Sequence, residues 1–336
     1  MLRFIVRRIL QTGLSLFALS ILLFAWLRSL PGGPVSALLG ERGTPESRAA
    51  LEKQLGMDQP IYVQYWAFLK RALQGDFGVS NGVQPGTPAL EVFLTRLPAT
   101  IELSVIAMIL AIGFAIPLGY IAAKRRGSLL DTGSIIGSLV GVAVPVFFLA
   151  FVLKYIFAIQ LGWLPPTGRQ TVGIDATRIT NFFVLDGILT REWDAAWDAL
   201  KHLILPSIAL ASIPFAVIFR ITRASVLEVL DEDYVRTARA KGLKAPVIRG
   251  RHIMRNALIP VVTIIGLQIG ALLAGAVLTE TVFAFQGIGQ ALALGFNKKD
   301  YAVLQVLIMM AALIYIIVNL LVDIAYAVID PRVRTR

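Results

Sequence analysis

The sequence predicts an all-α integral membrane protein with six transmembrane helices. Of its 336 residues, 57% are hydrophobic and only 16% are charged, and the mean hydropathy is +0.74. A typical soluble domain carries about 25% charged residues. The apolar residues form long uninterrupted runs, and a helix needs about 20 such residues to cross the roughly 30 Å hydrocarbon core of a bilayer.

The first of these runs extends from Ile9 to Leu30 and follows three arginines. We expect it to stay in the protein as a membrane helix. It exceeds the usual apolar region of a signal peptide, about 7 to 15 residues, and no A-x-A cleavage site follows it. The other five predicted spans are Thr100–Ala123, Thr132–Gln160, His202–Thr222, Leu258–Leu278 and Val303–Ile329. Pro145 and Pro206 should kink or break their helices, because proline lacks a backbone N–H group.

The chain divides into three predicted parts. Residues 1–30 form the N-terminal transmembrane helix, residues 31–99 form an external segment with short helices, and residues 100–336 form a five-helix core. The core contains a polar loop, residues 223–257, which lies between two apolar runs.

Two short helices are predicted in the external segment. Pro45 and Pro60 occupy the first-turn positions that proline favours, and Gly56 and Gly75 mark the ends. The second helix places apolar and aromatic side chains on one face: Ile61, Tyr65, Trp66, Leu69 and Leu73. Two interpretations stay open, a small helix packed on the protein, and a helix that lies at the lipid headgroups through its aromatic residues.

Charge predicts the orientation in the membrane. If residues 1–8, 124–131, 220–257 and the C-terminus share one side, that side carries the whole formal excess of +11, and the other side is neutral. Loops rich in Lys and Arg face the cytoplasm. Both termini and the polar loop are therefore expected inside, and the basic charge needs no nucleic-acid partner.

The stretch from Asp231 to Pro260 carries ten formal charges. Each charge costs about 2.5 kcal/mol or more at the centre of a bilayer, so this stretch must lie in water. Its pattern predicts one helix from Asp233 to Lys241 and another from Pro246 to Asn256, with Gly242 as the break between them.

This stretch resembles the cytoplasmic coupling loop of the membrane subunits of ATP-binding-cassette (ABC) importers. The general pattern there is Glu-Ala-Ala, three residues, Gly, and a downstream Ile-x-Leu-Pro. Ala238, Gly242 and Pro260 fit this pattern, whereas Arg236 replaces the glutamate. Seventeen residues separate Gly242 from Pro260, where the general pattern has twelve. The longer basic version, DYVRTARAKGL followed by HxxRNALIP, is similar to the dipeptide, oligopeptide and nickel branch.

Two further strings carry the resemblance. LTETVFAFQGIG is similar to the family's ETVF-x-x-PGxG, with Gln286 in place of the usual proline, and NLLVDIAYAVIDPRVR is similar to its C-terminal signature. The resemblance implies the type I ABC importer permease fold in the cytoplasmic (inner) membrane, and import of dipeptides or oligopeptides, with nickel as the alternative substrate. It also implies a second homologous permease subunit, two ABC ATPase subunits and an extracytoplasmic substrate-binding protein as partners.

The resemblance further implies which residues couple the chain to the ATPase subunits. They are Asp233, Tyr234, Arg236, Ala238, Arg239, Ala240, Lys241, Gly242, Leu243, Arg255, Asn256 and Pro260.

The chain itself is not expected to be an enzyme or to bind a cofactor. It has no cysteine and only two histidines, His202 and His252, so a metal centre is not expected. It has no HExxH, no GxSxG and no phosphate-binding GxxxxGK[ST] motif. ATP and Mg²⁺ are therefore expected on partner subunits.

Four charged residues in or near the spans are candidates for the transport path or its gate: Glu102, Lys154, Glu280 and Asp323. Their other interpretations are placement at a span end, snorkelling to the surface, or a hydrogen bond to a neighbouring helix. An ion-coupled secondary transporter, the alternative class, would show paired broken helices or buried acids near the bilayer centre. The predicted positions near span ends favour the importer.

Overall fold

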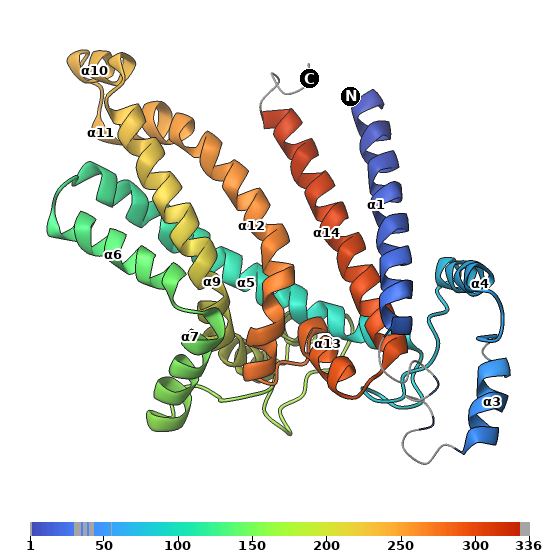
Figure 1. Cartoon of the computed structure of the whole chain (residues 1–336). Coiled ribbons are helices and arrows are strands. Elements are labelled where there is room, and N and C mark those ends of the chain that lie inside the picture. The colour runs from blue at the N-terminus through green and yellow to red at the C-terminus, as the bar shows by residue number, and fades with distance from the viewer. Residues whose placement is uncertain (1, 30–34, 36–38, 40–43, 55, 330–336) are drawn as a thin grey trace. The chain divides into compact units, whose positions relative to one another are not determined.

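The computed structural model describes residues 2–29, 35, 39, 44–54 and 56–329. Regular structure in this part of the chain is helical, apart from an isolated β-bridge between Val79 and Pro88 (Figure 1). The chain forms two compact units. One comprises residues 1–98, 286–321 and 331–336, and the other comprises residues 99–285 and 322–330.

The first unit is built from helices at both ends of the chain. Its elements are α1 (Leu2–Ser29), α3 (Pro45–Gln54), α4 (Ile61–Leu73), α13 (Ile288–Asn297) and the first parts of α5 (Ala89–Lys124) and α14 (Tyr301–Ile329). Leu23 and Leu27 of α1 pack against Tyr301 and Leu304 of α14. A second apolar cluster joins α5, α13 and α14 through Val92, Phe93, Ala291, Val303 and Leu307.

A buried carboxylate fixes the segment before α5 in this unit. Asp300 is fully buried just before α14. Its Oδ2 accepts hydrogen bonds from Ser80 Oγ at 2.6 Å, from the Gly82 N–H at 2.9 Å and from the Val83 N–H at 3.0 Å. The segment therefore has a defined position although it contains little regular structure.

The second unit is organised around α9. Its elements are the rest of α5, α6 (Leu129–Ala143), α7 (Val146–Leu153), the π-helical η2 (Lys154–Gln160), α8 (Phe183–Leu189), α9 (Trp193–Leu230), α10 (Asp233–Ala240), α11 (Ala245–Val247), the π-helical η3 (Ile248–Met254) and α12 (Arg255–Val282). Helices α6, α7, α8 and α12 all pack on α9. Leu203, Leu210 and Phe219 of α9 and Leu103 of α5 are buried in the shared core. Burial of these apolar side chains holds the unit together.

Within the part of the chain that the structure describes, five helices are long and apolar enough to cross a membrane. Helix α6 and the following α7 and η2 form a bent pair, which makes a sixth span if it is counted as one. The span predicted over Thr132–Gln160 is this bent pair, which turns by 104° between Ala143 and Val146, so the predicted kink or break at Pro145 is confirmed. Pro145 lies at this bend and caps α7. Pro206 does not break its helix, because α9 continues through it.

Candidate functional site

The polar loop after α9 folds as a helix, a glycine turn and a second helix. Helix α10 ends at Ala240, next to the predicted Lys241. The prediction that the second helix ends at Asn256 is wrong. The chain stays helical from Ala245 through α11 and η3 into α12 (Figure 1). The second half of the loop is therefore a direct extension of a membrane span.

Gly242 closes α10 with a Schellman motif. Its φ angle is +72°. The Gly242 N–H donates to the carbonyl of Arg239 at 3.0 Å, and the Leu243 N–H donates to the carbonyl of Ala238 at 3.3 Å. Both bonds satisfy carbonyls that the helix end leaves without partners. Glycine suits this position because a left-handed φ angle is unfavourable for residues with a Cβ atom.

An apolar cluster holds the loop on the ends of the long helices. Val235 and Ala238 of α10 are buried with Ile248 and Ile253 of η3. The same cluster includes Ala123 of α5, Val226 of α9 and Ala257 of α12. We call these seven residues the loop core. Through this core, α10 packs against the ends of α5, α9 and α12.

Most of the residues predicted to couple the chain to an ATPase lie on the surface. Of the twelve, Ala238 is buried and the others are exposed: Asp233, Tyr234, Arg236, Arg239, Ala240, Lys241, Gly242, Leu243, Arg255, Asn256 and Pro260. The Nδ2 of Asn256 donates to Tyr234 Oη at 2.9 Å and joins α10 to α12. The exposed face combines several cations with the half-exposed apolar side chain of Leu243.

An ion pair that the sequence did not indicate ties α6 to the stem of the loop. Arg223 of α9 donates from Nε to Asp131 Oδ1 at 2.6 Å and from Nη2 to Oδ2 at 2.8 Å. Asp131 is buried and also accepts from the Gly127 N–H at 2.9 Å. Such a two-point contact fixes orientation as well as distance. The Ser128-x-x-Asp131 pattern is typical of a helix N-terminus, but nothing in the sequence indicated Arg223 as the partner of Asp131.

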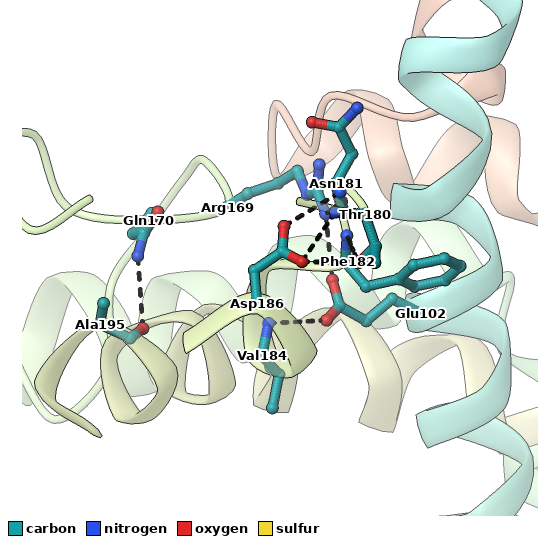
Figure 2. A network of polar contacts seen from close by, with 9 residues as sticks. All are labelled: Glu102, Arg169, Gln170, Thr180, Asn181, Phe182, Val184, Asp186 and Ala195. Carbon is teal, nitrogen blue, oxygen red and sulfur yellow. Dashed lines mark hydrogen bonds and ion pairs between the residues drawn. The ribbon is translucent and has the colours of Figure 1, made fainter. Parts of the chain in front are cut away.

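Glu102, a predicted path residue, lies in a buried ion pair in a separate part of this unit (Figure 2). Its Oε2 accepts from Arg169 Nη2 at 3.0 Å, and its Oε1 accepts from the Val184 N–H at 2.9 Å. The guanidinium of Arg169 also donates to the Asn181 carbonyl at 2.9 Å and lies 3.6 Å from the centre of the Phe183 ring. Burial lowers the pKa of Arg169, and the charge of Glu102 opposes this effect.

Two more carboxylates order the segment that contains Arg169. Asp186 accepts from the Thr180 hydroxyl at 2.6 Å and from the Asn181 N–H at 3.0 Å, where the backbone has a positive φ angle (Figure 2). Glu192 accepts from the Thr177 N–H at 2.7 Å, and this bond lowers the pKa of the Glu192 carboxyl. Arg169 and Asp186 were missed in the sequence. The available signal for Arg169 was Glu102, because an acid in a predicted span needs a cation from another segment as its partner.

Two other predicted path residues, Glu280 and Lys154, lie near the end of α12 that is opposite to the coupling loop. Glu280 is fully buried and accepts from Thr100 Oγ1 at 2.6 Å. Lys154 Nζ donates to the Val282 carbonyl at 2.8 Å. Asp323 belongs to the last part of α14, where the side chains lie outside the described residues.

Helix α5 begins at Ala89, before the apolar run, so Glu102 lies inside the helix, and its position at the end of the membrane span stays a prediction. The ammonium of Lys154 has a hydrogen-bond partner at the end of α12, and its snorkelling to the membrane surface stays a prediction. The acids and Lys154 therefore connect α5, α12, η2 and the segment before α8. A role for them in the transport path stays a prediction.

Comparison with known families agrees with this architecture. Residues 115–335 match the family described as binding-protein-dependent transport system inner membrane component, and residues 1–104 match its N-terminal region. The chain belongs to this family. It is therefore a multi-pass inner-membrane subunit of a transport system, and the alternative of an ion-coupled secondary transporter is excluded.

Three relatives match over nearly the full length of the chain. The dipeptide transport system permease protein DppB of Alkalihalophilus pseudofirmus is 42% identical and covers 99% of this chain and 100% of its own. The di/tripeptide permease protein DppB of Pseudomonas aeruginosa is 45% identical over 99% of both chains. The oligopeptide permease protein AppB of Bacillus subtilis is 36% identical, again over 99% of both.

A solved structure shows the same fold. It is titled as inward-facing conformations of the MetNI methionine ABC transporter and has a TM-score of 0.54 at 13% sequence identity. The match covers 71% of this chain and 97% of that chain. The chain thus has the all-α fold of an ABC importer permease, as the sequence predicted.

Proposed function

We propose that this chain is a permease subunit that moves dipeptides or short oligopeptides across the cytoplasmic membrane. The observation that carries the proposal is the match to peptide permeases at 42% and 45% identity over 99% of the chain. The energy comes from ATP, which partner subunits bind with Mg²⁺ and hydrolyse. The chain itself contributes the membrane path and the coupling loop.

The complete transporter, in this proposal, contains this chain, a second homologous permease and two ABC ATPase subunits. A binding protein delivers the peptide from the extracytoplasmic side. Both termini and the coupling loop of this chain face the cytoplasm, since the whole formal charge excess of +11 lies on that side.

The geometry of the loop supports its role in coupling. The exposed cations of α10 and its turn suit an acidic groove on an ATPase subunit, and charge complementarity of this kind sets partner choice and association rate. The loop core transfers a displacement of α10 to α9 and α12. The bidentate contact between Asp131 and Arg223 transfers it to α6.

The polar contacts at the other end of α12 support movement of this unit as one body. Glu102 joins α5 to Arg169, Glu280 joins α12 to α5, and Lys154 joins η2 to α12. In addition, the Gly168 N–H donates to the Phe283 carbonyl at 2.9 Å. Alternating access then follows from rotation of this unit against other parts of the transporter rather than from its own deformation.

Reconstitution of the complete transporter in vesicles tests the function. A dipeptide supplied with its binding protein should stimulate ATP hydrolysis and accumulate inside, whereas Ni²⁺ supplied in the same way should do neither. Stimulation by Ni²⁺ alone would contradict the peptide substrate.

The chain purified by itself should show no thermal shift with ATP, because it has no phosphate-binding loop.

Labelling of single cysteines tests the orientation. The natural chain has no cysteine, so the background is clean. Ser128→Cys and Lys244→Cys should react with an impermeant reagent only from the cytoplasm, and Asn81→Cys and Thr167→Cys only from outside. Equal reaction of all four in sealed cells would overturn the topology.

A further inference from the structure

Helix α4 packs against the part of α1 that crosses the membrane. The ring of Tyr65 lies 6.1 Å from that of Phe17 and 5.3 Å from that of Phe24, and the ring of Phe68 lies 5.6 Å from that of Phe24. The Tyr65 hydroxyl and the Ser20 hydroxyl are 2.9 Å apart. These aromatic and polar contacts fix α4 beside α1 (Figure 1).

The contacts on α1 give the depth of α4 in the bilayer. They begin at Phe17 and end at Arg28, whose Nε donates to Gln64 at 2.9 Å. At 1.5 Å per residue, this stretch of α1 covers about 16 Å, or roughly half of the 30 Å hydrocarbon core. By length and composition, the described part of α1 that can span the membrane is Leu10–Ser29. Helix α4 therefore lies within the bilayer half that contains the Ser29 end of α1, and not beyond that end.

The face of α4 that points away from α1 is apolar and exposed. Tyr62, Trp66 and Leu73 fall on one side of the helix and are 65%, 59% and 81% exposed, whereas Phe68 is buried on the other side. A face of this kind at this depth adjoins the exposed apolar side chains of α1 that fall on the same side as Phe17 and Phe24, namely Leu14 and Ile21, which are 69% and 42% exposed. The cations Lys70 and Arg71 lie in the last turn and are long enough to reach the headgroups.

We propose that α4 is a membrane-embedded half-helix whose Tyr62, Trp66 and Leu73 contact lipid acyl chains. The continuity with the lipid-facing surface of α1 and the depth set by Tyr65 and Phe68 select lipid as the partner. In this proposal one face of α4 packs on α1 and the other meets the bilayer, so the helix combines features of the two interpretations of the sequence and lies deeper than the headgroups. It also removes α4 from the segment that was predicted to be external.

Spin-label accessibility in the assembled transporter tests this placement. The cysteine-free chain allows single labels at Trp66→Cys and Leu73→Cys, with Ala50→Cys on α3 as the matched exposed control. The complex is placed in vesicles of phosphatidylethanolamine and phosphatidylglycerol. Collisions with oxygen should exceed collisions with a water-soluble nickel chelate at Trp66 and Leu73, and the order should reverse at Ala50.

Two results would overturn the proposal. A higher collision rate with the nickel chelate at Trp66 and Leu73 would place α4 in water. Low rates with both reagents would mean that a protein partner covers the face. Because label attachment can disturb folding, a second measurement uses the unmodified chain with a photoactivatable phospholipid. Lipid adducts should form on the tryptic peptide of residues 54–70, and their absence would also refute the assignment.

Discussion

Replacement of Gly242 tests whether the coupling loop must keep its observed shape. The φ angle of +72° is unfavourable for a residue with a Cβ atom by about 1 to 2 kcal/mol. A Cβ atom at this position meets nothing within 4 Å, so the strain comes from the backbone alone. Gly242→Val should lie at the upper end of this range because a β-branched side chain is poorly tolerated at positive φ. Gly242→Asn should cost less, because asparagine accepts the left-handed region.

The strain should lower the population of the loop conformation that docks. Each 1.4 kcal/mol corresponds to about a tenfold change in an equilibrium, so about 2 kcal/mol of strain in Gly242→Val should weaken binding of the ATPase subunits by roughly thirtyfold. Peptide-stimulated ATP hydrolysis and uptake are measured together in reconstituted vesicles. Both should fall, while the variant still inserts, assembles with its partner permease and recruits the binding protein.

Gly250 supplies the matched control. It lies in η3, its φ angle is not positive, and a Cβ atom there also meets nothing within 4 Å. Gly250→Ala should therefore leave coupling unchanged, whereas Gly242→Ala should impair it. Wild-type hydrolysis and uptake in Gly242→Val would mean that the loop is only a solvated connection, and the proposed route of coupling would be wrong.

Three further predictions concern the ion pairs and pH. Asp131→Asn should uncouple ATP hydrolysis from peptide uptake. The double variant Asp131→Arg and Arg223→Asp, which exchanges the two charges, should restore part of the lost coupling. No rescue by the double variant would indicate a role of Asp131 beyond this pair. Glu102→Gln should lower stability by about 3 kcal/mol, because Arg169 stays buried without its counter-charge. Thermal unfolding in detergent measures this loss of stability. The double variant Glu102→Leu and Arg169→Leu should recover most of the lost stability.

The folded state lowers the pKa of Glu192 from its ordinary value of 4.5, so its stabilisation is complete above that pH and is lost as pH falls through the lower folded value. The protection of the Thr177 amide against hydrogen exchange, corrected for the intrinsic rate at each pH, should fall over that range, and Glu192→Gln should abolish this change.

The sequence predicts the helices well and their partners poorly. Apolar runs located the spans, and Pro45, Pro60, Gly56 and Gly75 located the ends of α3 and α4, because these signals act within one or two turns. The start of α5 was missed because it extends beyond the apolar run.

Long-range contacts explain most of the remaining errors. Arg169 and Glu102 are far apart in the sequence, and so are Asp131 and Arg223, so no local pattern connects them. Pro145 and Pro206 look alike in sequence, yet Pro145 lies at a break between two helices and Pro206 lies inside one. Pro206 is buried within α9, where the neighbouring helices hold the chain helical through it. Tertiary packing therefore decides which proline interrupts a span.

The unbroken helix from Ala245 into α12 restricts which coupling loops can replace one another. Seventeen residues separate Gly242 from Pro260, five more than in the general importer pattern. In a continuous helix, five residues add about 7.5 Å of length and rotate the following face by about 140°. A loop transplanted from a permease with the shorter spacing would therefore present its docking helix at another height and angle. An engineer who exchanges loops between transporters must exchange this helical stem with them.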